Sequence, residues 1–359
     1  MEYNLVNHLA RDKRVQLTLM GTVPPGVPNP FRSYSQSIRV EAIRTTKRPD
    51  TFVDLVLSNL YYPSKLTDTY DLIHFNVLPG LRTITSLALE KLKTNSARLL
   101  VSVHGVPNET LLYNTSMERR FLTKLHWSLA INNMRKFEIV IVNSTFARSS
   151  LISCGVEPSR IRVIPNGIHE DLLQHSTSAV RENQIICYAN FFPIKGQHLL
   201  IRAFAASGLA KDHTLLCVGG GDEDYRSACL ALINSLGLGG SVDIRGPPSR
   251  RELFQMIQRA KISVFPSMFE SFGIGILESM ALGTPVIATM FGGPPDFITN
   301  GREGFLTDPF NTALFAEHLV KLCNDVVLRD SLKANARLKA EQLTWNKIAP
   351  MYVSLYTCS

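Results

Sequence analysis

Short apolar runs alternate with longer amphipathic segments along almost the whole chain. This alternation is typical of βαβ units, in which helices connect parallel strands. Because the runs are apolar throughout, both faces of each predicted sheet should be buried. The predicted strands form one series at residues 15–20, 71–75, 98–103 and 138–142, and a second series at 161–165, 185–189, 214–219, 242–246, 262–266 and 285–289.

The chain has 359 residues, which is enough for two domains at about 150 residues each. The turn Pro165-Asn166-Gly167 and the polar stretch 175–184 that follows it indicate a boundary. We therefore predict a first Rossmann-like domain over residues 1–165, a second over 166–343 and a terminal helix over 344–359. The predicted fold class is α/β, with two doubly wound domains.

The amino end departs from this plan. A doubly wound domain ordinarily opens with a strand and a glycine-rich turn into the first helix. Here the first residues have the helical spacing of Leu5, Val6 and Leu9, and no such turn follows them. Three explanations stay open: the chain is shortened at its amino end, its start is misassigned, or the first sheet lacks one central strand.

Charge is distributed unevenly between the two halves. Residues 1–165 contain 21 Lys and Arg against 12 Asp and Glu, a net charge of +9, whereas residues 166–359 contain 17 against 18, a net charge of −1. A basic half can meet nucleic acid, anionic lipid or an anionic small molecule. Nucleic acid is disfavoured, because the sequence shows neither a recognition motif nor a basic groove interleaved with aromatic residues.

Composition narrows the class of protein further. Hydrophobic residues make up 45% of the chain, which suits packed cores and excludes a disordered protein. The six cysteines form no CxxC pair, so we predict no structural zinc site. The sequence shows neither a signal peptide nor an apolar run long enough to span a membrane, and we expect a cytoplasmic protein.

Residues 264–293 carry the most informative pattern. A strand is followed by a loop with Glu270 and Gly273, and then by a helix that contains Glu278. Such a loop presents backbone N–H groups and a helix N-terminus to an anion such as a nucleotide diphosphate. The two carboxylates can reach different hydroxyls of one elongated ligand. Taken alone, the two glutamates also fit another interpretation, in which Glu270 is a solvated residue of a surface loop and Glu278 interacts with the helix dipole.

The motif PSxxExFGxxxLExMAxGxPVIAT over these residues resembles the donor-binding motif of the retaining GT-B glycosyltransferases of family 4. Further matching segments occur in the family's order: LLVSVHG, NSTFARSSLISCGVEPSRIRVIPNGI, FPIKGQHLLIRAF, LLCVGGG, VDIRGPPSRREL and TWNKIA. The resemblance implies a GT-B fold with a cleft between the two domains and a terminal helix that returns to the first. It also implies transfer of a hexose from a nucleoside diphosphate sugar to an unidentified acceptor, with neither a cofactor nor a metal ion.

The resemblance also assigns site residues. It implies that Glu270 bonds a hydroxyl of the donor sugar, that Lys195 neutralises the leaving phosphate and that His104 faces the sugar from the first domain. These three are the predicted catalytic residues. The predicted donor-binding residues are Asn190, Phe272, Gly273, Ile274, Glu278, Gly220 and Gly246, with Glu278 on the ribose and the backbone around Gly273 on the diphosphate.

One position departs from the family pattern. The family usually has an arginine five residues before the lysine, and here that residue is Asn190. Arginine binds phosphate with a charged bidentate fork that asparagine lacks. The alternative interpretation is therefore a catalytically impaired GT-B scaffold that binds nucleotide or partner proteins. A third, weaker interpretation is a sugar-nucleotide epimerase or a phosphorylase on the same fold.

Two further segments have competing interpretations. Asp222-Glu223-Asp224 resembles a metal-binding D-x-D triplet, but its position before a helical pattern favours a helix N-terminus. In residues 116–137, an apolar stripe is predicted to pack inward against the core. The competing interpretation is that this basic helix brings the first domain to an anionic membrane, at the inner membrane face, where the acceptor is a lipid-linked molecule or a polysaccharide. The stripe comprises Met117, Phe121, Leu125 and Leu129.

Overall fold

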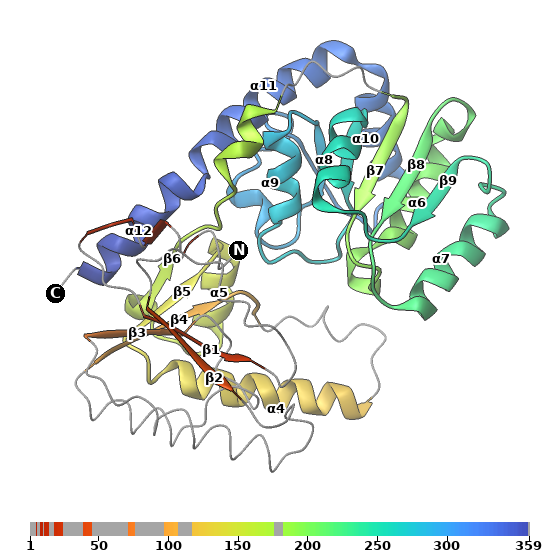
Figure 1. Cartoon of the computed structure of the whole chain (residues 1–359). Helices are drawn as coiled ribbons and strands as arrows, with labels where there is room; N and C mark the ends of the chain where they lie inside the picture. Colours follow the sequence, from red (N-terminus) through yellow and green to blue (C-terminus); the bar gives the residue numbers. More distant parts are fainter. Residues whose placement is uncertain are drawn as a thin grey trace. The chain divides into compact units, whose positions relative to one another are not determined.

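The structure is a computed structural model, and it describes residues 5, 8–9, 11–13, 18–23, 39–44, 71–75, 97–106, 117–175 and 182–357. The described chain forms two compact units (Figure 1). Of the described residues, the first unit contains those up to Asn166 together with those from Trp345 onward, and the second contains those within Gly167–Thr344. No helix in the described part of the chain is both long enough and apolar enough to cross a membrane.

The second unit is built on a six-stranded parallel sheet with the order β12-β11-β10-β7-β8-β9. From β7 the chain adds β8 and β9 on one side, and then returns to add β10, β11 and β12 on the other. The order of strands therefore reverses between β7 and β10, which defines a topological switch point. The strands are β7 (Gln184–Tyr188), β8 (Thr214–Val218), β9 (Val242–Arg245), β10 (Ile262–Phe265), β11 (Val286–Thr289) and β12 (Phe305–Thr307).

Helices cover both faces of this sheet. One buried cluster joins the sheet to α6, α7 and α10, and a second joins its other face to α8, α9 and α11. The four residues of β10 are buried, as are those of β11, in agreement with their uniformly apolar sequences. The helices are α6 (Gln197–Ser207), α7 (Glu223–Ser235), α8 (Arg250–Arg259), α9 (Ile274–Ala281), α10 (Thr312–Asn324) and α11 (Val326–Gln342).

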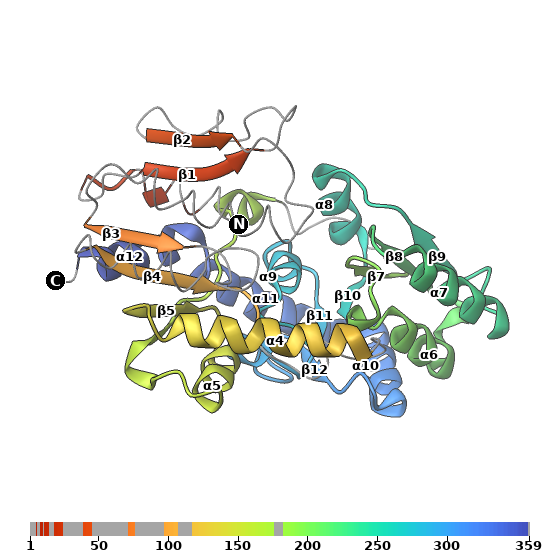
Figure 2. The same ribbon diagram turned by 90° about the horizontal axis from the view of Figure 1, so that it is seen from below.

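The first unit contains a four-stranded parallel sheet with the order β3-β4-β5-β6. Figure 2 shows β3, β4 and β5 of this sheet. Its strands are β3 (Leu72–Phe75), β4 (Arg98–Val103), β5 (Ile139–Val142) and β6 (Ile161–Val163). The predicted strands grouped residues 161–165 with the second series, which is wrong, whereas the predicted first domain over residues 1–165 includes them. β6 pairs with β5, because the short helix α5 (Thr145–Ser153) returns the chain to the neighbouring edge. A separate parallel pair consists of β1 (Thr18–Val23) and β2 (Arg39–Arg44).

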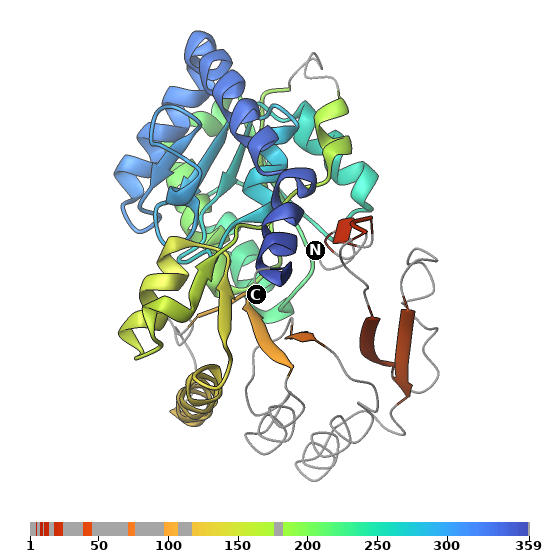
Figure 3. The same cartoon turned by 90° about the vertical axis from the view of Figure 1, so that its left-hand side faces the viewer.

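The terminal helix α12 (Trp345–Thr357) packs within the first unit, beside its four-stranded sheet (Figure 3). Trp345 is 1% exposed and Tyr352 is 4% exposed. Successive residues of β3 contact different elements, because their side chains alternate between the faces of the sheet. His74 meets Tyr356 of α12, whereas Phe75 meets Phe137, which follows α4. The helix runs uninterrupted through Pro350.

Helix α4 (Met117–Met134) does not bury the predicted stripe. Its buried residues include Ala130, Asn133 and Met134, so the inward face is rotated relative to the prediction. An inward-packing stripe is therefore wrong for the four residues concerned. Their exposed fractions are 87% for Met117, 65% for Phe121, 40% for Leu125 and 38% for Leu129.

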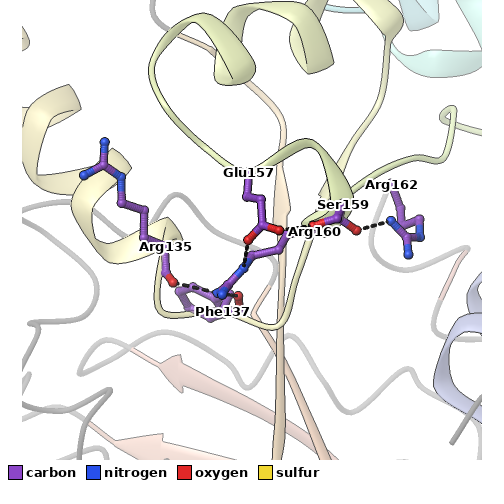
Figure 4. Close-up of polar contacts among 6 residues, drawn as sticks. All are labelled: Arg135, Phe137, Glu157, Ser159, Arg160 and Arg162. Carbon is purple, nitrogen blue, oxygen red and sulfur yellow. Dashed lines mark hydrogen bonds and ion pairs between the residues drawn. The ribbon is translucent and has the colours of Figure 1, made fainter.

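An arginine holds the carboxyl end of α4 (Figure 4). The Arg160 guanidinium donates to the carbonyl oxygens of Arg135 at 2.9 Å and Phe137 at 3.2 Å, and it also bonds Glu157 at 3.1 Å. Carbonyl groups at the carboxyl end of a helix lack N–H donors within the helix, and the Arg160 guanidinium supplies donors to two such carbonyls here. The Arg135 side chain itself points away from this contact and is exposed.

Candidate donor-binding site

Two of the predicted catalytic residues lie at the switch point of the second sheet. Lys195 ends the short helix η5 (Pro193–Lys195) directly after β7, and Glu270 lies in the loop directly after β10. In open α/β sheets, ligands bind outside the carboxyl ends of the strands at such a point. The topology therefore brings together two residues that are 75 positions apart.

Lys195 and Glu270 form a direct ion pair. Lys195 Nζ donates to Glu270 Oε2 at 2.7 Å, and the two side chains are 28% and 20% exposed. A weaker contact to the same oxygen comes from the Ser267 hydroxyl at 3.4 Å. The pair is thus a cation and an anion side by side in a partly shielded position, open to a ligand that carries both phosphate and hydroxyl groups.

Close backbone contact fixes the two loops against each other. The Met268 amide donates to the Ile194 carbonyl at 2.8 Å. Gly196 has a φ of +70°, and a Cβ there would lie 2.0 Å from the Pro266 carbonyl oxygen. Only glycine fits that position without displacing backbone, which explains the glycine that follows Lys195. On its other side, Glu270 is held by main-chain bonds with Phe291 at 3.1 Å and Gly293 at 2.8 Å.

Helix α9 begins shortly after Glu270 and has a glycine N-cap. Gly273 is its N-cap with a φ of +97°, and the first amide to bond back is that of Leu277, to Gly273. The amides at Ile274 and the next two residues therefore have no acceptor within the helix. Phe272 is buried, and its ring contacts that of Phe297 at 5.1 Å. The predicted backbone donors thus lie on a rigid turn next to Glu270.

Tyr188 supports this turn and was not singled out from the sequence. Its hydroxyl donates to the Gly275 carbonyl and lies 3.0 Å from the Ser279 hydroxyl. Burial raises the pKa of Tyr188, so the phenol stays protonated and serves as a fixed donor. A tyrosine at the end of an apolar strand gives no local signal of this role.

Glu278 lies on α9, about one turn from the start of that helix. Its side chain is 16% exposed, and Arg250 Nη2 lies 3.3 Å from its Oε1. Burial raises the pKa of Glu278, and the Arg250 guanidinium opposes this rise. Arg250 was also missed, because a single arginine in a helix start carries no distinguishing pattern.

The remaining predicted donor-binding residues lie at carboxyl ends of β7, β8 and β9. Asn190 follows β7, and its side chain is exposed while its carbonyl accepts from Gln197 at 3.1 Å. Gly220 follows β8, and a Cβ there would lie 3.7 Å from the Pro247 ring, so the loops after β8 and β9 are neighbours. Gly246 is exposed in the second of these loops.

His104 belongs to the other unit. It directly follows β4, which is the predicted strand end, and it is half-buried. Its charge interaction contributes to lowering the pKa of His74, after the larger effect of burial. The predicted donor-binding residues all belong to the second unit and His104 to the first.

The acidic triplet is a helix start. Asp222 accepts a hydrogen bond from the Tyr225 amide at 2.9 Å and caps α7, and Glu223 pairs with Arg226 at 3.7 Å. This confirms the helix N-terminus that the sequence favoured. In the part of the chain that the structure describes, no three His, Cys, Asp or Glu residues are grouped so as to hold a metal ion.

Comparison with known proteins gives matches along both units. The family model described as Glycosyltransferase Family 4 matches residues 3–172, and the one described as Glycosyl transferases group 1 matches residues 169–339. The D-inositol 3-phosphate glycosyltransferase of Acidothermus cellulolyticus is 29% identical over 229 residues, which are 59% of this chain and 51% of that protein. The MMP alpha-(1->4)-mannosyltransferase of Mycolicibacterium hassiacum is 28% identical over 222 residues, 61% of this chain and 53% of that protein. The chain thus spans about half the length of the curated relatives it matches.

Solved structures show the same fold. Sucrose-phosphate synthase from Thermosynechococcus elongatus superposes with a TM-score of 0.76 at 23% identity, covering 98% of this chain and 90% of that one. Anabaena HepE in complex with UDP and glucose gives a TM-score of 0.69 at 22% identity, covering 89% and 86%. The solved structures show the fold, and the two family models, which together match residues 3–339, show that the chain belongs to the GT-B glycosyltransferases of family 4.

Proposed function

We propose that this protein is a retaining glycosyltransferase that moves a sugar from a nucleoside diphosphate sugar to an acceptor. The observation that carries the proposal is the 2.7 Å pair of Lys195 and Glu270 at the switch point of the second sheet. The amino end of α9 adds backbone donors beside that pair. A cation, an anion and free amides at one edge match the phosphates and hydroxyls of a sugar nucleotide.

The donor should lie along the carboxyl ends of the strands. In this arrangement Glu278 bonds the ribose, the amides from Phe272 to Ile274 hold the diphosphate, and Glu270 bonds a sugar hydroxyl. Solved structures of HepE contain UDP and UDP-glucose, which supports a uridine nucleotide as the first donor to test.

Lys195 has the central chemical role. Negative charge accumulates on the diphosphate as the bond to the sugar breaks, and Lys195 stabilises that charge by electrostatic attraction. We do not propose a carboxylate nucleophile, because Glu270 is paired with Lys195 and assigned to a sugar hydroxyl, and the proposed site has no glycosidase-like pair of carboxylates flanking the anomeric carbon. The acceptor then attacks from the face that the phosphate leaves, and the phosphate takes the acceptor's proton. On the basis of the sequence resemblance, we keep His104 of the first unit as a third proposed catalytic residue.

A donor-hydrolysis experiment tests the proposal. Purified protein is incubated with radiolabelled UDP-glucose, GDP-mannose and ADP-glucose, and release of free sugar is followed with time. We expect slow hydrolysis of one donor, because water replaces a missing acceptor. Absence of both hydrolysis and binding for every donor would instead support the impaired scaffold that Asn190 suggests.

We also propose that α4 attaches the first unit to an anionic membrane, where a lipid-linked acceptor lies. Support comes from the exposed apolar residues of α4, with Phe121 at 65% and Leu125 at 40%. Lys124 lies exposed beside them, and residues 1–165 carry a net charge of +9. Basic residues near an anionic surface contribute about 1 kcal/mol each, so a few of them give salt-sensitive binding.

Vesicle sedimentation tests this second proposal. The wild type should sediment with phosphatidylglycerol vesicles at low salt and be released at high salt. Phe121→Ser should weaken the attachment, whereas Leu338→Ser on α11, which removes a 59% exposed leucine from the second unit, should not. Binding that ignores salt, or equal behaviour of the two variants, would exclude α4 as the membrane-binding surface.

A further inference from the structure

Glu278 pairs with a charged side chain that comes from a different helix. Arg250 Nη2 lies 3.3 Å from Glu278 Oε1, joining the start of α8 to the middle of α9. Glu278 is 16% exposed, whereas Arg250 is 64% exposed. A largely buried carboxylate is thus reached from the surface by a guanidinium that remains open to solvent.

The Arg250 side chain is held in this direction. Ser249 caps α8 and exchanges hydrogen bonds with Glu252 in a capping box, which fixes the backbone at Arg250. The guanidinium also lies over the Phe254 ring, with its carbon 5.0 Å from the ring centroid. The Arg250 guanidinium is therefore oriented by two contacts, one with the Phe254 ring and one with the Glu278 carboxylate.

Structural stability alone explains this pair poorly. Ion pairs with one well-exposed partner contribute little to stability, since solvent screens them and the long side chain loses freedom. The pair has a larger effect on the Glu278 carboxylate than on stability, because without Arg250 this buried side chain would be free to turn or to take up a proton. The pair therefore acts mainly on the orientation and charge of Glu278.

We infer that Arg250 is a positioning residue for the nucleotide, which holds the Glu278 carboxylate in the direction needed to bond the ribose hydroxyls. This inference rests on the proposed function, in which Glu278 contacts the ribose. It adds a residue from α8 to the donor site and assigns it an effect on nucleotide affinity that is transmitted through Glu278. Substituting Arg250 should therefore weaken the binding only of nucleotides that have ribose hydroxyls for Glu278 to bond.

A double-mutant cycle with UDP as the probe tests the inference by titration calorimetry. Arg250→Ala should weaken UDP binding about tenfold, as expected for one charge-assisted hydrogen bond. Glu278→Gln should weaken it at least as much, and the double variant should bind UDP no more weakly than Glu278→Gln alone. Arg250→Lys should restore part of the affinity.

Two controls separate positioning from other effects. Arg251→Ala removes the adjacent exposed arginine of the same helix turn and should leave UDP affinity unchanged. With 2′,3′-dideoxy-UDP, which lacks the ribose hydroxyls, Arg250→Ala should bind as the wild type does. Melting temperatures of all variants are measured alongside, so that a loss of folding is recognised.

The outcomes distinguish this inference from the proposed function. Additive losses in the cycle, or an equal loss for UDP and the dideoxy probe, would overturn the positioning role while leaving the glycosyltransferase proposal intact. Failure of the wild-type protein to bind UDP, GDP and ADP would overturn the proposed function itself, and this inference with it.

Discussion

Replacing Glu270 by glutamine separates its chemical role from its structural one. The side chain keeps its shape but loses the charge that pairs with Lys195 at 2.7 Å. In the proposed reaction the carboxylate also bonds a sugar hydroxyl, and a charged hydrogen bond of this kind contributes about 1.5–3 kcal/mol. Together with the loss of positioning, we expect kcat/KM for the donor to fall about a hundredfold or more.

Folding should change little. The backbone of Glu270 is held independently by its bonds with Phe291 at 3.1 Å and Gly293 at 2.8 Å. Lys195, 28% exposed, can be solvated when its partner is lost, so the stability cost should not exceed about 1 kcal/mol. The loop should therefore keep its conformation in the variant.

The assay combines donor turnover with urea unfolding. Glu223→Gln serves as the matched control, because it removes a carboxylate that is 76% exposed on α7 of the same unit. We expect that control to match the wild type in both measurements. Turnover of Glu270→Gln within threefold of the wild type would refute the reasoning, and so would a loss of activity that merely follows a loss of stability.

Four other perturbations have defined outcomes. Asn190→Arg should tighten UDP binding in calorimetry, because the exposed asparagine follows β7 and an arginine there can form a charged fork to the diphosphate; equal affinities would show that this position does not face the diphosphate. Lowering the pH from 7.5 to 5.5 should reduce the free energy of unfolding by about 1.4 kcal/mol through His74, because burial lowers its pKa from 6.5 to about 4 and protonation then favours the unfolded chain below pH 6.5. Urea titrations at both pH values check this prediction. If the free energy of unfolding of His74→Gln fell by the same amount between the two pH values, the pH dependence would belong to other groups. Tyr356→Phe should destabilise the first unit by about 1 kcal/mol, because it removes the 2.6 Å hydrogen bond to His74. Deletion of residues 344–359 should lower the melting temperature much more. An unchanged melting curve after the deletion would contradict the packing of α12.

Local sequence determined the elements of the second unit. The apolar runs at 262–266 and 285–289 correspond to β10 (Ile262–Phe265) and β11 (Val286–Thr289), because strands buried on both faces must be apolar at every position. The three-residue strand β12 (Phe305–Thr307) was missed, since so short a run gives no periodic signal. The helix start at Asp222 was also readable from neighbouring residues.

Other features depended on residues distant in sequence. Helix α4 was predicted, but its sequence carries apolar residues on more than one side, so periodicity could not decide which side packs inward. The place of β6 depended on how α5 returns the chain to the sheet. The buried side of α4 and the sheet position of β6 are both decided by the surfaces against which each element packs.

The site shows the same division. The resemblance identified Glu270 and Lys195 individually, yet their 2.7 Å pairing follows from the reversal of strand order between β7 and β10. Arg250 and Tyr188 gave no signal in the sequence and were found only through their contacts with α9. Periodicity and capping are set by residues within a few positions of one another, so the sequence alone indicated most of the strands and the start of α7. Contacts between side chains from different loops depend on strand order and packing, and those only the tertiary structure decided.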